Sequence, residues 1–173
     1  MNDLKPNSVL SVDNLSIGYT SKKKETIIAS DINFKLEKGH LIGLVGANGI
    51  GKSTLLRTLT KVQEPLQGNI SINNIDLKRL TALQLAKQLS LVLTETLYST
   101  NMSVYELVAL GRHPYTNWVG SLTDKDRAII DNAIELTTIT NLKERHCYEL
   151  SDGQLQKVMI ARAIAQDTDL IIL

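Results

Sequence analysis

The chain has little that would tie it to an oxidising compartment, a membrane interior or a nucleic acid. Its 173 residues include one cysteine, Cys147, so no disulfide can form within it, and a cytoplasmic location is the simplest interpretation. The net charge is only +1, which excludes the basic field that holds nucleic acid. The first ten residues do not read as a signal peptide, and no apolar run approaches the roughly 18 residues of a spanning helix. We therefore expect any membrane role to require a partner.

Metal-ligand and repeat patterns are also missing. His40, His113 and His146 have no cysteine or carboxylate at the spacing of metal ligands, so we expect no structural metal. There is no internal repeat and no low-complexity segment. What remains is a chain of ordinary composition, 43% hydrophobic, whose length suits one globular domain or a domain with a small insertion.

Strand and helix patterns alternate along the chain. Residues 8–36 alternate as short strands around a polar tip, and 40–46 form a continuous apolar run typical of a strand buried on both faces in a parallel sheet. Helical spacing follows from Ser53. The later predicted segments are, in order, a strand with a turn at 70–77, a helix and a strand over 81–93, a helical block over 95–150, a helix from 151 and a strand at 169–173. This order predicts an α/β fold with a largely parallel sheet.

A phosphate-binding loop is predicted directly after the apolar run. Residues 46–53, GANGIGKS, match the pattern G-x-x-x-x-G-K-[ST] between a predicted strand and a predicted helix. Lys52 is expected to reach the β- and γ-phosphates, Ser53 to ligate Mg²⁺ and Thr54 to help hold the α-phosphate side. The expected nucleotide-binding residues of this loop are Gly46, Asn48, Gly49, Gly51, Lys52, Ser53 and Thr54.

The loop identifies a nucleoside triphosphate site but not the protein that uses it. No Asn-Lys-x-Asp stretch is present to read guanine, which argues against a GTPase. Arg112, Arg127 and Arg145 are not placed as a recognisable lid, which argues against a small-molecule kinase.

Residues 150–156, LSDGQLQ, narrow the choice, because here the chain resembles the ATP-binding cassette (ABC) transporter ATPases. The family signature is Leu-Ser-Gly-Gly-Gln at the start of a helix, and Asp152 replaces its first glycine. The resemblance implies that Ser151, Gly153 and Gln154 contact the γ-phosphate of an ATP held mainly by another subunit. A helix N-terminus with a capping serine suits that role, although a carboxylate beside it would oppose a phosphate.

Further positions fit the same resemblance. Tyr19 stands where these ATPases place an aromatic ring to stack on adenine. Thr94 and Glu95 stand where the family carries a glutamine that touches Mg²⁺, and either side chain offers an oxygen to the metal or its water. The resemblance therefore implies Lys52 and Glu95 as catalytic residues, and Ser53 with Thr94 or Glu95 as metal ligands.

The stretch 104–115, VYELVALGRHPY, is similar to ABC ATPases of importers for iron-siderophores, haem and cobalamin. Within it, GRHPY is expected to be a turn that could meet a partner, and a plain surface turn remains the alternative for Arg112 and His113. Trp118 and Cys147 are expected to be packing residues.

The last residues, DLIIL, resemble the apolar strand of the family's second nucleotide motif, whose next residues are an aspartate and a glutamate. The acidic pair is not in these 173 residues. We therefore expect an ABC ATPase domain that is incomplete at its C-terminus and that binds ATP but hydrolyses it poorly.

The expected fold is a P-loop NTPase of ABC type, with a mostly parallel core sheet, an N-terminal antiparallel β subdomain and a helical insertion. Residues 8–94 are expected to hold the β subdomain and phosphate-loop core, 95–150 the helical subdomain, and 151–173 the signature helix and the following strand.

The expected function is the ATP-hydrolysing subunit of an ABC importer for an iron-siderophore, haem or cobalamin, with ATP and Mg²⁺ as cofactors. Its expected partners are a second copy arranged head to tail, a transmembrane permease that holds it on the cytoplasmic face of the membrane and, indirectly, a substrate-binding protein, but no nucleic acid. Two alternatives stay open: a soluble ABC ATPase without a membrane partner, and a nucleotide-binding module that never hydrolyses.

Overall fold

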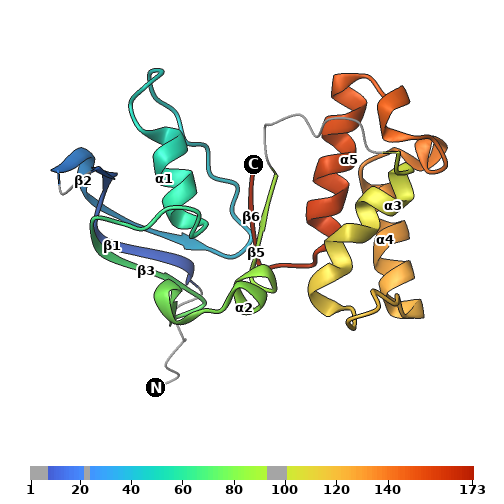
Figure 1. Cartoon of the computed structure of the whole chain (residues 1–173), viewed down its shortest axis with the longest axis horizontal. Helices are drawn as coiled ribbons and strands as arrows, with labels where there is room; N and C mark the ends of the chain where they lie inside the picture. Colours follow the sequence, from blue (N-terminus) through green and yellow to red (C-terminus); the bar gives the residue numbers. More distant parts are fainter. Residues whose placement is uncertain (1–7, 22–23, 93–100) are drawn as a thin grey trace. The chain divides into compact units, whose positions relative to one another are not determined.

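The computed structural model describes residues 8–21, 24–92 and 101–173, and the chain divides into two compact units. Unit 1 spans Met1–Gln88 and unit 2 spans Leu89–Leu173. Unit 1 combines an antiparallel sheet with helix α1, while unit 2 combines three packed helices with a short parallel strand pair (Figure 1). The predicted N-terminal antiparallel sheet and the predicted helical segment are therefore both present.

The sheet of unit 1 has the strand order β2-β1-β3-β4, and every neighbouring pair is antiparallel. Its strands are β1 (Ser8–Ser21), β2 (Lys24–Glu37), β3 (Gln67–Ile72) and β4 (Ile75–Asp76). Alternation along β1 and β3, reset in β1 by the register shift between Val12 and Leu15, buries one apolar set, because successive side chains of a strand point to opposite faces. That set is Leu10, Val12, Leu15, Ile17, Ile70 and Ile72.

Short connections set the pairing of these strands. Asn73 and Asn74 both have positive φ, 49° and 64°, as a tight two-residue hairpin between β3 and β4 requires. Helix α1 (Lys52–Leu59) lies beside the sheet (Figure 1). The unit ends with η1 (Leu77–Arg79) and α2 (Ala82–Ala86).

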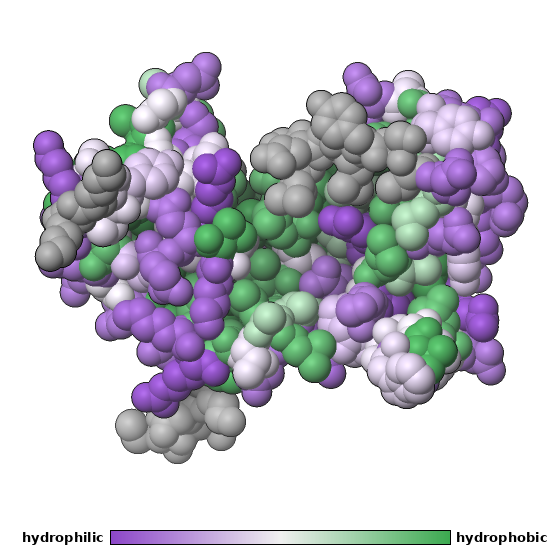
Figure 2. Space-filling view, in the orientation of Figure 1, coloured by the Kyte–Doolittle hydropathy of each residue, from purple (hydrophilic) through white to green (hydrophobic). Residues whose placement is uncertain are grey.

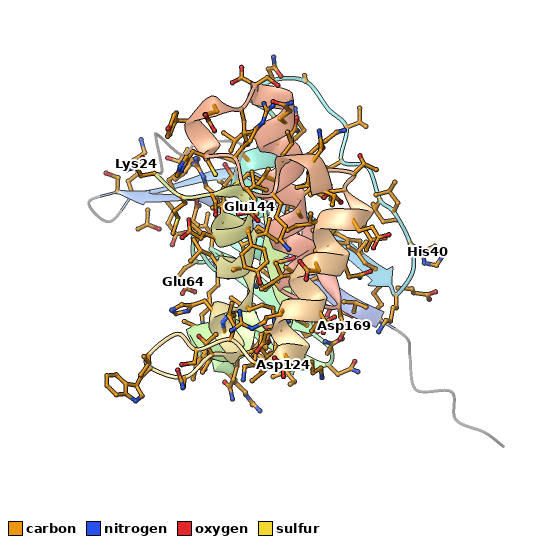
Figure 3. The ribbon with its side chains drawn as sticks, turned by 90° about the vertical axis from the view of Figure 1, so that its right-hand side faces the viewer. Lys24, His40, Glu64, Asp124, Glu144 and Asp169 are labelled. Carbon is orange, nitrogen blue, oxygen red and sulfur yellow. The ribbon has the colours of Figure 1, made fainter. Side chains whose placement is uncertain are left out.

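The prediction of a buried strand over residues 40–46 is wrong in this structure. The segment has no regular structure, and Leu41 and Val45 are 95% and 93% exposed. His40 points away from the ribbon (Figure 3). A strand exists only through hydrogen bonds to a neighbouring strand, and the described sheet of unit 1 offers only antiparallel pairs among β1–β4. The apolar run shows that this segment is hydrophobic. It does not show whether a neighbouring strand is available to pair with it.

Unit 2 is built around three helices. They are α3 (Val104–Ala109), α4 (Asp124–Leu136) and α5 (Asp152–Ala165). Short 3-10 turns join them at η2 (Leu110–Tyr115), η3 (Thr140–Leu142) and η4 (Cys147–Glu149). The helices share a core that includes Val104, Leu107, Val108, Ile130, Ile134, Ile139, Val158 and Ala161. Strands β5 (Leu89–Leu91) and β6 (Leu170–Ile172) pair in parallel, as the alternating order predicted.

Mostly hydrophilic side chains cover the visible surface around α3 and α4 (Figure 2), which agrees with burial of the apolar stripe of each helix. Gly111 allows η2 to approach α5 closely, because a Cβ at this position would lie 2.3 Å from the carbonyl oxygen of Arg162. Among the described residues, no helix combines the length and the apolar character needed to cross a membrane.

A buried ion pair fastens η2 to α4 and α5. The Nε of Arg112 donates to Oδ1 of Asp126 at 2.8 Å, and its Nη1 donates to the carbonyl oxygen of Ala165 at 3.0 Å. Arg112 also lies over the ring of Tyr115, 4.0 Å from the centroid. The interpretation of Arg112 as part of a surface turn is therefore wrong, because its side chain is buried, while His113 is exposed.

The carboxylate of Asp126 is stabilised in its charged form. Its Oδ2 accepts from the backbone N and Oγ1 of Thr123, at 3.0 and 2.6 Å. These hydrogen bonds, opposed by burial and assisted by Arg112, lower the pKa of Asp126 from 3.8 to about 2. The pair therefore remains ionised at neutral pH.

Two side chains expected in the core have different surroundings. Cys147 is buried, as predicted. Trp118 is 97% exposed, so its interpretation as a packing residue is wrong. Trp118 lies in a loop that Asn117 organises, since Oδ1 of Asn117 accepts from the backbone N of Val119 and of Ser121.

We predict that Asp126→Asn destabilises the protein by about 3 to 5 kcal/mol, because it leaves the buried Arg112 without a counter-charge. Urea unfolding at pH 7 measures this change. A decrease in the free energy of unfolding below about 1 kcal/mol would show that the ion pair between Arg112 and Asp126 does not stabilise the fold.

The matched control is Asp131→Asn, which removes the exposed ion pair between Asp131 and Lys143, 2.7 Å long, at an expected loss below about 1 kcal/mol.

The pKa of Asp126 is lower in the folded than in the unfolded chain. Its stabilisation is thus fully present above about pH 4 and is lost as the pH falls towards 2, so the difference between wild type and Asp126→Asn should shrink over that range.

Candidate nucleotide-binding site

The phosphate loop leads into the N-terminus of α1. Gly51 is the N-cap residue, at φ 108° and ψ 8°, and no side chain caps the helix there. Within the described part of the chain, the backbone N–H groups of Lys52, Ser53 and Thr54 donate to no acceptor. Unsatisfied amides at a helix N-terminus attract anions, so this end of α1 is suited to a phosphate.

The other α-helices of the described ranges are closed by their own side chains. Each has a reciprocal capping box, in which the N-cap side chain and the N3 side chain accept from each other's backbone N–H. These boxes are Thr81 with Gln84, Ser103 with Glu106, Thr123 with Asp126, and Ser151 with Gln154. The open N-terminus of α1 is therefore specific to the loop that carries the phosphate-binding pattern.

Gly51 is required by its surroundings. A φ of 108° is strained for any residue with a side chain. A Cβ added at this position would also lie 2.6 Å from Cγ2 of Ile28 on β2. The loop therefore packs against the sheet in a way that only glycine permits.

The side chain of Lys52 folds back and binds the backbone of the phosphate loop. Its Nζ donates to the carbonyl oxygens of Gly46 and Ala47, at 2.7 and 2.9 Å. The ammonium therefore lies against the start of the loop, at Gly46 and Ala47. Ser53 is exposed on the first turn of α1, with its hydroxyl accessible.

Tyr19 lies next to this helix. Its hydroxyl is 3.0 Å from Oγ1 of Thr54, although the two residues are 35 positions apart. Thr54 is buried, at 4% exposure, while Tyr19 on β1 is 47% exposed. The structure thus brings the predicted adenine-facing ring to the phosphate loop. The sequence does not predict this hydrogen bond, because no short-range pattern relates β1 to α1.

The signature residues lie in unit 2, at the start of α5. Ser151 is the N-cap; its Oγ accepts from the backbone N of Gln154 at 3.4 Å, and Oε1 of Gln154 accepts from the backbone N of Ser151 at 3.0 Å. Asp152 and Gly153 are exposed in the first turn. The capping role of Ser151 and the start of this helix agree with the sequence prediction. Thr94 and Glu95 lie outside the described residues, so their expected roles stay predictions.

Comparison with known proteins gives a consistent result. The sequence model of the ABC transporter family matches residues 29–173. The uncharacterized ABC transporter ATP-binding protein MJ0873 of Methanocaldococcus jannaschii is 38% identical over 165 residues, which are 95% of this chain and 56% of that protein. The iron(3+)-hydroxamate import ATP-binding protein FhuC of Bacillus subtilis is 35% identical over 164 residues, which are 95% of this chain and 60% of that protein.

A solved structure supports the same fold. CbiO1 from Clostridium perfringens, part of the ABC transporter complex cbiONQ, superposes with a TM-score of 0.81 at 27% identity, covering 96% of this chain and 65% of that protein. The chain thus spans less than two thirds of the length of these proteins. Since the family match extends over most of its residues, this chain belongs to the ABC transporter family.

Proposed function

We propose that this chain is the nucleotide-binding part of an ABC ATPase subunit and that it binds the triphosphate of ATP at residues 46–54. The observation that carries the proposal is the uncapped N-terminus of α1, whose first residue, Lys52, folds its ammonium onto the carbonyl oxygens of the same loop. A triphosphate offers several anionic oxygens to these donors, and charge-assisted hydrogen bonds are the strong ones. Lys52 then exchanges two carbonyl oxygens for phosphate oxygens.

Ser53 fits the expected Mg²⁺ ion. Its hydroxyl is an oxygen donor, it is exposed at the helix end that receives the phosphates, and Mg²⁺ prefers oxygen ligands. When bound, the ion supplies neutralisation of phosphate charge. Thr94 or Glu95 is proposed as the second protein ligand, and Glu95 with Lys52 as the catalytic pair.

The signature helix is proposed to serve a second copy of the chain. The N-terminus of α5 carries Ser151, Gly153 and Gln154, and the resemblance assigns these residues to the γ-phosphate of an ATP bound by the neighbouring copy. In the structure Ser151 and Gln154 are occupied with each other. Both side chains only accept in this capping box, so the hydroxyl proton of Ser151 and the amide protons of Gln154 remain available to a phosphate.

The cargo is proposed to be an iron chelate, haem or cobalamin, taken up through a permease that holds the ATPase on the cytoplasmic face of the membrane. The support is the resemblance of residues 104–115 together with the likeness to an iron(3+)-hydroxamate import protein. We further propose the domain boundaries given by the sequence, and slow hydrolysis by a polypeptide of these 173 residues alone.

We predict that Lys52→Ala weakens Mg-ATP binding by at least about 10-fold, because hydrogen bonds to charged groups contribute about 1.5 to 3 kcal/mol. Isothermal titration calorimetry of the purified chain measures the change. The matched control is Arg57→Ala, which removes an exposed cation from the last turn of the same helix and should leave affinity unchanged. Wild-type protein that binds no Mg-ATP at millimolar concentration would refute the proposed function.

We also predict that Ser151→Ala in the complete gene product weakens ATP-dependent dimerisation about 10-fold, as loss of a phosphate contact implies. Analytical ultracentrifugation with a non-hydrolysable ATP analogue provides the measurement. Ser103→Ala is the control, because Ser103 closes an equivalent capping box on α3 and both variants lose a helix cap. An equal effect of the two variants would show that only helix stability is involved.

A further inference from the structure

The end of β1 is fastened to the chain around α1 by three hydrogen bonds within unit 1. The backbone N of Leu66 donates to the carbonyl oxygen of Ser16 at 2.9 Å. The side-chain Nε2 of Gln63 donates to the carbonyl oxygen of Gly18. The third bond joins the hydroxyls of Tyr19 and Thr54, 3.0 Å apart. The first two hold the backbone of β1 just before Tyr19, so the side-chain contact of Tyr19 starts from a fixed stretch of strand.

Thr54 differs from the other threonines of this helix region. Oγ1 of Thr58 donates to the carbonyl oxygen of Thr54 at 2.8 Å, and Oγ1 of Thr60 donates to that of Leu56 at 2.9 Å. Both hydroxyl protons are thus used within the helix, as is common for threonine. In the described part of unit 1, the hydroxyl of Thr54 has Tyr19 as its one side-chain partner.

The hydrogen bond between the hydroxyls of Tyr19 and Thr54 has a donor and an acceptor, and which one donates decides what Thr54 can do next. Each hydroxyl has one proton to donate and two lone pairs to accept with. If Tyr19 donates to Oγ1 of Thr54, the proton of Thr54 is free for another acceptor. Thr54 is the third residue of α1, beside the open amides, so a bound phosphate is the acceptor at hand. Successive hydrogen bonds of this kind polarise and strengthen one another.

We propose that Tyr19 is a positioning residue whose hydroxyl donates to Thr54 and thereby directs the hydroxyl of Thr54 towards the phosphates of the nucleotide. The inference rests on the proposed ATP binding and adds to it. The half-exposed ring remains available to the base while its hydroxyl acts on the phosphate loop. One side chain then links the two ends of the nucleotide site.

The test separates the hydroxyl from the ring by means of a ligand without a base. Tyr19→Phe keeps the ring and removes the hydroxyl, and tripolyphosphate with Mg²⁺ has nothing to stack on the ring. We expect Tyr19→Phe to weaken tripolyphosphate binding by about 2- to 10-fold, the range of one hydrogen bond. Displacement of a fluorescent ATP analogue measures the affinity, and melting temperatures of the free variants check folding.

Two variants of the partner complete the experiment. Thr54→Val should reproduce the loss, the double variant Tyr19→Phe with Thr54→Val should lose no more than Thr54→Val alone, and Thr54→Ser should retain wild-type affinity. Losses that multiply in the double variant would overturn the proposal. So would equal tripolyphosphate affinity in wild type and Tyr19→Phe, including no measurable affinity in either. Failure of the proposed function has a different signature, namely wild-type protein that does not bind Mg-ATP.

Discussion

The nucleotide site depends on one electrostatic constraint, the unsatisfied amides at the N-terminus of α1. A helix end leaves backbone N–H groups without intrahelical partners, and proteins usually supply a side-chain acceptor. The capping boxes of α2, α3, α4 and α5 do so within the described residues. At α1 the N-cap is a glycine, which has no side chain to offer, and so the acceptor must come from elsewhere.

The same constraint explains the arrangement of Lys52 and Tyr19. The ammonium of Lys52 donates to the carbonyl oxygens of Gly46 and Ala47. These neutral acceptors are weaker partners than a phosphate, so nucleotide binding replaces them with charge-assisted bonds. The hydrogen bond between Tyr19 and Thr54 then places the ring and the hydroxyl of Tyr19 next to the same helix end. Gly51 permits the close packing of this loop against β2.

Local patterns were sufficient for most elements and insufficient for contacts that depend on distant residues. The strands β1 and β2, the Asn73–Asn74 turn and the Ser151 cap follow from alternation and capping chemistry close in sequence. Residues 40–46 were misjudged because hydrophobicity does not report whether a partner strand is present. Arg112 was misjudged because its partner, Asp126, lies on another helix. Trp118 was misjudged because aromatic character alone does not show packing, and this residue lies in a loop outside the helical core.

The central claim is tested most directly by following the backbone amides of the 19.1 kDa chain by ¹⁵N NMR during a Mg-ATP titration. Amide protons that donate to a phosphate oxygen move to higher frequency, so the largest shifts are expected at residues 51–54, saturating with ATP. Shifts confined to other residues, with 51–54 unchanged at millimolar Mg-ATP, would contradict it.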